Sequence, residues 1–154
     1  MAKVEIINIG DELLIGQVVN TNAAEMSKIL NSAGFDVIRI SVIGDSGNEI
    51  RKSVTDALQN ANIVIITGGL GPTKDDITKH VMCEYFGTTL VEDSRVREHI
   101  HELYKERPDV LNRLTATQWL VPESATILPN RVGSAPIMVF EQTGKLLVAL
   151  PGVP

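Results

Sequence analysis

The sequence predicts a three-layer α/β/α domain built on a mostly parallel, doubly wound sheet, with a β-hairpin in its C-terminal part. Two strand-like runs, residues 4–9 and 63–67, are almost continuously apolar, as strands of a parallel sheet are when helices cover both faces. Segments with helical spacing separate the strand-like runs, so strands and helices alternate. The length of 154 residues matches one ordinary domain, so a single domain is expected over residues 1–154.

The first half of the chain is expected to alternate strands and helices. The first helix begins at the capping-box spacing of Asn22 and Glu25, and the second at the better capping box of Ser46 and Glu49. Both helices then carry apolar residues on one face. Right-handed crossovers make this β-α-β-α-β unit one half of a doubly wound sheet. Its strands are expected at residues 4–9, 37–43 and 63–67.

The second half is expected to start with a helix over residues 77–86, which Gly87 ends. Ser94 is the expected N-cap of a polar helix that Arg107-Pro108 breaks. A β-hairpin is expected around Gln142-Thr143-Gly144. The other expected elements are strands at 88–91 and 126–128, a short helix at 109–118, and hairpin strands at 137–141 and 145–150.

Composition excludes several classes of protein. The net charge of −5 and the isoelectric point near 5.2 disfavour a general nucleic-acid or anionic-membrane binder, which needs clustered Lys and Arg. A phosphate ligand stays open, because backbone N–H groups and metal ions hold phosphate within acidic proteins. The single cysteine, Cys83, excludes an internal disulfide and is expected in the core. A cytoplasmic location is expected, since no signal peptide or apolar run near ~18 residues is found.

The strongest functional signal is the segment Thr67-Gly68-Gly69-Leu70-Gly71-Pro72-Thr73, between a buried strand and a helix. Glycines let the backbone adopt positive φ and approach a ligand, and the N-terminus of the next helix favours an anion. The segment also follows a central strand, at the end where open α/β sheets bind ligands. It fits neither the Walker loop nor the dinucleotide fingerprint. The hypothesis is a phosphate-binding loop, and the alternative is a tight turn without a ligand.

Acidic residues follow three neighbouring strand ends. Asp75 and Asp76 open the helix after the glycine-rich segment, Asp11 and Glu12 follow the first strand, and Asp45 follows the second. Two carboxylates would repel a bare phosphate, whereas a divalent cation would bridge carboxylate and phosphate oxygens, as Mg²⁺ does. The alternatives are a helix-dipole role for the aspartate pair and capping of the next helix by Asp45.

Four other side chains are weaker candidates. His99 and His101, two residues apart on a polar helix, are expected at the surface, and His80 is expected at the edge of the core. Trp119 could stack on a base, but its aliphatic neighbours favour a place in the core. The chain shows no Ser/His/Asp or Cys/His arrangement that would support covalent catalysis.

Taken together, these segments resemble the N-terminal domain of the CinA (competence/damage-inducible protein) family. The resemblance runs from residue 4 to the end of the chain, and its motifs are highly specific in combination. They are Gly10-Asp11-Glu12-Leu13-Leu14 with Gly16, Asn20-Thr21-Asn22, Gly68-Gly69-Leu70-Gly71-Pro72-Thr73 with Asp75, Asp76 and Thr78, Asn130 with Gly133-Ser134-Ala135-Pro136, and Leu150-Pro151-Gly152-Val153-Pro154. That domain is similar to the molybdopterin-binding domains of molybdenum-cofactor biosynthesis.

The resemblance implies a metal-dependent ADP-ribose pyrophosphatase that yields AMP and ribose 5-phosphate. It carries over Asp76 and Asp45 as functional acids. With the other acids at the strand ends, Asp76, Asp45 and Asp75 are the expected catalytic carboxylates, and Asp76, Asp45 and Asp11 the expected metal ligands. Mg²⁺ is the expected ion, and a K⁺ requirement is compatible with the resemblance although no residue indicates it. The residues expected to bind the substrate are Gly10, Asp11, Glu12, Asn22, Gly68, Gly69, Leu70, Gly71, Pro72, Thr73, Thr78, Asn130, Gly133, Ser134, Pro151 and Gly152.

Two departures from the family pattern bear on substrate preference. The family's Gly-Thr-Ala-Pro-Gly stands here as Gly133-Ser134-Ala135-Pro136-Ile137, and Thr115 and Trp119 replace an Asn and an Ala around Gln118.

Two rival functions stay open. One is adenylyl transfer to a pterin dithiolene, and the other is a pterin- or nucleotide-binding module without catalysis in competence or damage responses. The expected partner is a small-molecule nucleotide, with neither nucleic acid nor membrane, and self-association is open because relatives often form dimers or trimers. Many family members continue into an amidase domain, and the chain stops inside a turn at Pro154, so the natural protein is expected to be longer.

Overall fold

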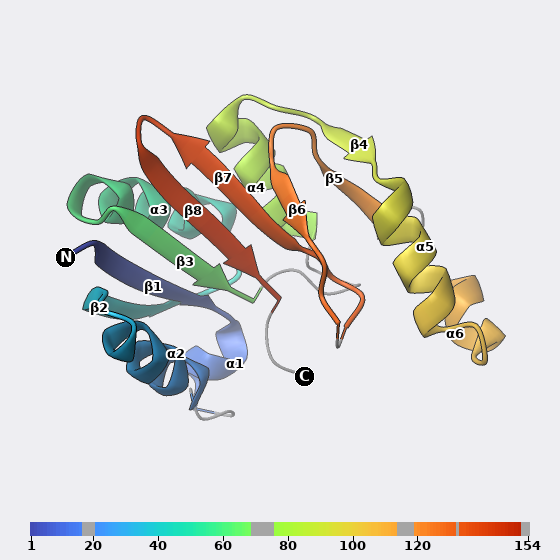
Figure 1. Cartoon of the computed structure of the whole chain (residues 1–154), viewed down its shortest axis with the longest axis horizontal. Coiled ribbons are helices and arrows are strands. Elements are labelled where there is room, and N and C mark those ends of the chain that lie inside the picture. The colour runs from blue at the N-terminus through green and yellow to red at the C-terminus, as the bar shows by residue number, and fades with distance from the viewer. Residues whose placement is uncertain (17–20, 69–75, 114–118, 132, 152–154) are drawn as a thin grey trace.

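Figure 1 shows the fold of the computed structural model, which describes residues 1–16, 21–68, 76–113, 119–131 and 133–151. The elements are β1 (Lys3–Ile9), α1 (Asp11–Leu14), α2 (Thr21–Ser32), β2 (Asp36–Ile43), α3 (Gly47–Asn60), β3 (Ile63–Thr67), α4 (Asp76–Phe86), β4 (Leu90–Glu92), α5 (Ser94–Leu103), α6 (Pro108–Arg113), β5 (Leu120–Pro122), β6 (Thr126–Leu128), β7 (Ile137–Gln142) and β8 (Lys145–Leu150). The expected strands and helices are therefore found, with ends shifted by a few residues; the helix expected at 109–118 is described as far as Arg113.

The main sheet has six strands in the order β2-β1-β3-β8-β7-β6. β1 runs parallel to β2 and β3, and β3 runs parallel to β8. β7 and β6 are antiparallel additions to the β8 edge of this parallel core. This arrangement confirms the mostly parallel sheet with a C-terminal hairpin, which the continuous apolar runs predict.

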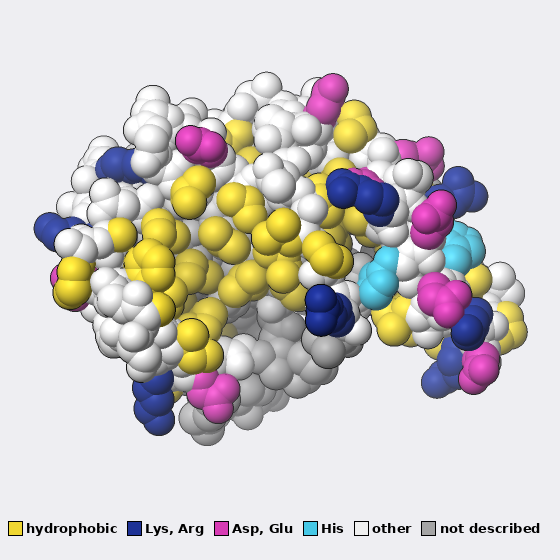
Figure 2. Space-filling model, in the orientation of Figure 1, with side chains coloured by type: hydrophobic (Ala, Val, Ile, Leu, Met, Phe, Trp, Pro, Cys, Tyr) yellow, Lys and Arg dark blue, Asp and Glu magenta, His cyan; other side chains and the backbone are white. Residues whose placement is uncertain are grey.

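Helices lie on both faces of the sheet, and on the face toward the viewer α2 lies at the β1–β2 end (Figure 1). Ala23 of α2 packs on one face, against Val4 and Ile6 of β1. On the opposite face, α3 and α4 bury Ile50 and Met82 against the strands. The result is the predicted three-layer arrangement. On the face seen in Figure 2, hydrophobic side chains also gather over the central strands.

A smaller unit lies beside the main sheet (Figure 1). β4 and β5 form an antiparallel pair, and α5 buries Val96 and Ile100 against Val121 of β5. Trp119 packs on the edge of this cluster and is half-buried, and its Nε1 donates a hydrogen bond to Glu92 Oε1 at 3.2 Å. The expectation that Trp119 contributes to the core is therefore confirmed for one face of its ring.

The helix caps differ from the sequence prediction. Asp93, not Ser94, caps α5, and its side chain accepts hydrogen bonds from the N–H groups of Arg95 and Val96. Ser46 is the N-cap of α3 but its hydroxyl makes no cap hydrogen bond. The expected capping box also fails at α2, because this helix already includes Thr21 and Asn22 lies inside it. A carboxylate at the N-cap competes well with a hydroxyl one residue later, since it can accept two N–H groups at once.

The C-terminal hairpin turns through two residues. Gln142 pairs with Lys145, so Thr143 and Gly144 alone connect β7 and β8. Both have positive φ, 49° and 78°, which is the geometry of a type I′ turn. The backbone twist of a type I′ turn matches that of two antiparallel strands. After the turn, β8 returns to the middle of the sheet and runs parallel to β3.

Glu5 is a buried acid in β1, only 3% exposed. Burial raises the pKa of its carboxyl, Arg39 partly opposes that rise, and Asp56 adds to it. Because the folded-state pKa lies above the unfolded value, the stabilising contribution belongs to the protonated form and is lost as the pH rises through the folded pKa. Glu5→Gln is therefore expected to raise the free energy of unfolding at pH 7, and this gain should shrink as the pH falls through the raised pKa and be lost below about pH 4.

The test of this prediction is urea unfolding of both proteins at pH 7 and at pH 4, with Glu98→Gln on the exposed side of α5 as the control. A Glu5→Gln variant that is less stable than the wild type at pH 7 would contradict the assignment of burial as the dominant effect.

The described helices include none that is both long enough and apolar enough to cross a membrane. Cys83 in α4 is buried, as expected of a core residue. Burial raises the pKa of its thiol, with an opposing effect from Lys79, so the group stays protonated near neutral pH. A protonated thiol is a poor nucleophile, which agrees with a packing role for Cys83.

Candidate functional site

The candidate site lies at the carboxyl edge of the parallel strands. β1, β2, β3 and β8 run parallel, so their last residues all end at one edge of the sheet. β7 runs antiparallel to β8 and β6 antiparallel to β7, so the connection between β6 and β7 lies at this same edge. The sheet therefore gathers there the chain segments that follow Ile9, Ile43, Thr67 and Leu150, together with residues 129–136.

Gly68 is the residue where the central strand leaves the sheet. Its φ is +90°, and a Cβ atom on it would lie 2.2 Å from the carbonyl oxygen of Ile9. Its N–H donates to the carbonyl oxygen of Leu150 at 3.3 Å. The sequence predicts that this glycine gives a ligand close access to the backbone. The contact that requires glycine in the structure is with the neighbouring strand β1. Gly68 therefore allows β1 and the end of β3 to approach each other closely.

Below the edge, the buried side chains of Asn8 and Thr67 connect three strands, and the sequence does not predict this role for either residue. Thr67 Oγ1 of β3 donates to Asn8 Oδ1 of β1 at 3.0 Å. Asn8 Nδ2 donates in turn to the carbonyl oxygen of Ser41 in β2 at 3.1 Å. Because an unpaired buried polar group is costly, these bonds hold the ends of three strands in one register. In the sequence, the only sign of this role is that Asn8 and Thr67 are polar residues in otherwise apolar runs.

Carboxylates gather beside the end of β2. The backbone N–H of Asp45 donates to Asp11 Oδ1 at 3.2 Å, and that of Gly44 donates to Glu49 Oε2 at 3.1 Å. A Cβ atom on Gly44 would lie 2.8 Å from Asp11 Oδ1 and 2.9 Å from Glu49 Oε2, so glycine makes room for both. The structure thus places the carboxylate of Asp11 against the backbone of Asp45, and it adds the carboxylate of Glu49, a residue with the spacing of a capping box.

The first turn of α4 reaches the same edge. α3 and α4 run alongside each other in the same direction: Gly47 faces Val81, and Arg51 pairs with Glu84 one turn later, at 2.5 Å. α3 begins at the end of β2, so α4 also begins at the edge. The hydroxyl of Thr78, in this first turn, is fully buried and has no hydrogen-bond partner among the residues that the structure describes.

Several predicted site residues lie outside the described part of the chain. They are Gly69, Leu70, Gly71, Pro72, Thr73, Asp75 and Gly152. Asp76 is described as the first residue of α4, and Glu12 as part of α1, but their side chains fall outside the description. Gly10 directly follows β1, and its N–H donates to the carbonyl oxygen of Ile43 at 3.0 Å. Asn22 and Pro151 are half-buried, in the first turn of α2 and directly after β8.

The connection between β6 and β7 is held by two side chains. Asn130 Nδ2 donates to the carbonyl oxygen of Ala135 at 2.8 Å, and His99 Nε2 donates to that of Gly133 at 2.9 Å. The prediction of a surface role for His99 is wrong, because this hydrogen bond holds the His99 ring against the segment that connects β6 and β7. His101 is exposed as expected, whereas His80, expected at the edge of the core, is exposed as well.

The donor set fits a divalent ion only in part. The described residues include no group of three His, Cys, Asp or Glu side chains placed to hold a metal. The carboxylates of Asp11 and Glu49 supply hard oxygen donors beside Gly44 at this edge of the sheet, and such donors are the ones that Mg²⁺ prefers. Mg²⁺ commonly binds through one or two carboxylates plus substrate phosphates and water, so these residues fit an ion that arrives with a phosphate ligand.

Comparisons with known proteins place this geometry in a family. The model of the family described as "Probable molybdopterin binding domain" matches residues 5–154. A solved structure of the protein CinA from Thermoplasma acidophilum is 33% identical, with a TM-score of 0.86, and the match covers 99% of this chain and 89% of that one. The chain belongs to the CinA family. It is a CinA-type, molybdopterin-binding-like domain, as the sequence motifs imply.

Longer relatives share this CinA-type domain. A competence-damage inducible protein of Clostridium tetani is 43% identical over 150 residues, which are 97% of this chain and 37% of that protein. A protein of the same description from Caldicellulosiruptor saccharolyticus is 44% identical, and the match covers 97% of this chain and 36% of that protein. The chain thus spans little more than a third of these relatives.

A more distant likeness concerns the fold alone. The molybdopterin biosynthesis enzyme MoaB from Thermus thermophilus matches with a TM-score of 0.62 at 19% identity, over 100% of this chain and 83% of that one. The mostly parallel sheet with its antiparallel strands is therefore a fold that CinA shares with MoaB.

Proposed function

We propose that this domain binds a nucleoside diphosphate sugar of the ADP-ribose class and hydrolyses its pyrophosphate with the help of a divalent cation. The observation that carries the proposal is the buried, unpartnered hydroxyl of Thr78 in the first turn of α4. Buried polar groups in proteins are nearly always hydrogen-bonded, so a group without a partner in the described part of the chain is expected to meet a ligand or water. A helix N-terminus favours an anion. A phosphate oxygen there would accept the hydrogen bond of the Thr78 hydroxyl and interact favourably with the N-terminus of α4.

The acidic residues at the same edge support the hydrolytic step. In the reaction a water oxygen bonds to one phosphorus, the bridging P–O bond breaks, and AMP and ribose 5-phosphate leave while the water proton is released. A divalent ion, when bound, would neutralise the pyrophosphate and lower the pKa of the attacking water. Asp76, Asp45 and Asp11 would hold that ion, with Asp75 nearby in sequence. Glu49 and Asp11 already position the Gly44–Asp45 backbone by hydrogen bonds.

The second candidate function is binding of a pterin, with or without adenylyl transfer. It is favoured by the family that the chain matches, described as "Probable molybdopterin binding domain". Thermal-shift measurements with ADP-ribose, ATP and molybdopterin, each with Mg²⁺, separate the candidates. The proposal expects the largest rise in Tm with ADP-ribose, because a ligand that binds only the folded state stabilises it by mass action. A rise with molybdopterin alone would overturn it.

Thr78→Val tests the role of the buried hydroxyl. The side chains have nearly the same shape, so the change removes one hydroxyl from a buried position. The free energy of unfolding is expected to stay level or rise, because an unpaired buried hydroxyl costs about 1–3 kcal/mol. The affinity for ADP-ribose is expected to fall about tenfold or more, since a hydrogen bond to a charged group contributes about 1.5–3 kcal/mol.

Thr78→Ser, which keeps the hydroxyl, is the matched control and should bind ADP-ribose nearly as well as the wild type. Titration calorimetry of the three proteins gives the answer. Unchanged affinity in Thr78→Val would mean that the hydroxyl does not contact the ligand.

A further inference from the structure

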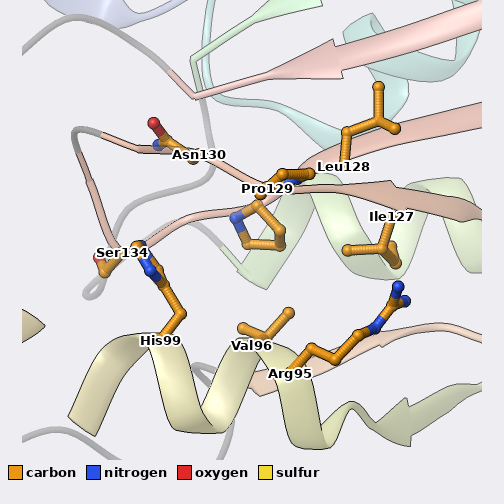
Figure 3. Close-up of a pocket in the computed structure, with 9 residues that line it drawn as sticks. Arg95, Val96, His99, Ile127, Leu128, Pro129, Asn130 and Ser134 are labelled. Atoms are coloured by element: carbon orange, nitrogen blue, oxygen red, sulfur yellow. The ribbon is translucent and has the colours of Figure 1, made fainter. Parts of the chain in front are cut away.

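A pocket of about 180 Å³ lies between α5 and the end of β6 with its following connection. Figure 3 shows its walls: His99 and Ser134 at one end, Val96 and Pro129 in the middle, and Arg95 with Ile127 at the other end. Most of the lining is hydrocarbon, from aliphatic and proline side chains. None of the catalytic roles described above uses Arg95, Val96 or His99.

The walls of the pocket are fixed in place by contacts within the protein. Val96 is 6% exposed in the core cluster of α5, and Ile127 packs on that cluster. The hydrogen bond from His99 Nε2 to the carbonyl of Gly133 ties α5 to the opposite wall at 2.9 Å. A carbonyl oxygen only accepts, so Nε2 carries the proton and Nδ1 of the neutral ring is left as an acceptor. Such a pocket is formed before a ligand arrives.

The chemistry of the lining selects a flat, heteroaromatic ligand. Pockets for drug-sized molecules measure about 300–1,000 Å³, so this smaller pocket has room for one ring system and not for a whole nucleotide. Aliphatic walls can pack against the two faces of a ring. The imidazole nitrogen of His99 and the hydroxyl of Ser134 can form hydrogen bonds with polar atoms at its edge. The guanidinium of Arg95, whose side chain is 75% exposed, pairs with Asp93 at 3.3 Å. Arg95 also lines the pocket, and an arginine side chain can stack on an aromatic face.

We propose that this pocket is the subsite for the fused nitrogen heterocycle of the ligand, the adenine ring of a nucleotide, with the same chemistry open to a pterin ring. It lies on the edge of the sheet where α4 begins, because residues 129–136 connect strands at that edge. One part of the edge would then hold phosphate and another the base. The assignment of a base subsite rests on the proposed function. The pocket can nevertheless be tested separately, with ligands that carry no phosphate.

The experiment follows the imidazole signal of His99 by nuclear magnetic resonance in the purified chain, with the signal assigned from a His99→Gln variant. Adenosine, neopterin and ribose 5-phosphate are titrated separately. Adenosine is expected to move the His99 signal and to leave that of His80, which lies outside this pocket, unchanged. Ribose 5-phosphate, which has no base, is expected to leave His99 unchanged. A stronger response to neopterin than to adenosine would overturn adenine as the natural ring.

Two arginines on α5 provide a matched pair of variants. Arg95 lines the pocket, whereas Arg97 lies over the ring of Trp119, 5.5 Å from its centroid. Arg95→Ala is expected to weaken adenosine binding about tenfold, and Arg97→Ala to leave it unchanged. No response of His99 to either ring, or equal losses in both variants, would overturn the base subsite. Loss of ADP-ribose binding with retained adenosine binding would count against the proposed phosphate site alone.

Discussion

Asp76→Asn is expected to keep its fold and to release AMP from ADP-ribose about 100-fold more slowly than the wild type, or slower still. The change is nearly isosteric and removes one negative charge from the first turn of α4. If that charge holds a metal ion, losing about 2.7 kcal/mol of transition-state stabilisation accounts for a 100-fold fall in turnover. The free energy of unfolding should change by less than about 1 kcal/mol, because only a helix-dipole contribution is lost.

Asp75→Asn, one residue earlier in the sequence, is the matched control, and it should lower turnover less. Turnover is measured as a function of Mg²⁺ concentration for all three proteins, and more Mg²⁺ should restore part of the loss in Asp76→Asn. Full activity in Asp76→Asn would end its assignment as a metal ligand and leave the acidic pair as a stabiliser of the helix N-terminus.

Gly68→Ala is expected to lower the free energy of unfolding by about 3 kcal/mol or more. Two effects add in this variant. An alanine at a φ of +90° is strained by about 1–3 kcal/mol. Its Cβ would also meet the carbonyl oxygen of Ile9 at 2.2 Å, so β1 or β3 must move. Urea unfolding followed by circular dichroism measures the loss.

Gly87→Ala separates these two effects. Gly87 also has a positive φ, +64°, but a Cβ atom there would have nothing within 4 Å. This variant is expected to lose only the strain, about 1–2 kcal/mol. Equal losses in the two variants would show that the close approach to Ile9 carries no cost of its own.

The parts of the fold that depend on local pattern could be predicted from the sequence. The apolar runs that became β1 and β3 are buried on both faces, and a parallel sheet has few other ways to bury them. Once these strands are parallel, their ends share one edge, so glycine and aspartate after each strand predict the place of the candidate site. The same topology brings the backbone of Asp45 against the carboxylate of Asp11.

Side-chain partners across the fold could not be predicted in this way. Glu49 has the spacing of a capping box, yet its carboxylate binds the N–H of Gly44, because the end of β2 presents that group within reach. Gly68 reads as a ligand-facing glycine, but its close neighbour comes from a strand that pairs only in the folded sheet. His99 looks like a surface residue because its partner, Gly133, is far along the chain. Each case depends on a tertiary contact that no local pattern records.

The central claim is that the carboxyl edge of this CinA-type sheet holds a pyrophosphate and cleaves it. The most direct measurement is the release of AMP and ribose 5-phosphate from ADP-ribose by the purified chain, with Mg²⁺ and with the ion removed by a chelator. The proposal expects both products in equal amounts, only with the ion, and a marked fall in rate in Thr78→Val. ADP-ribose that stays intact in the presence of Mg²⁺, while the folded chain binds it, would contradict hydrolysis and leave a binding domain.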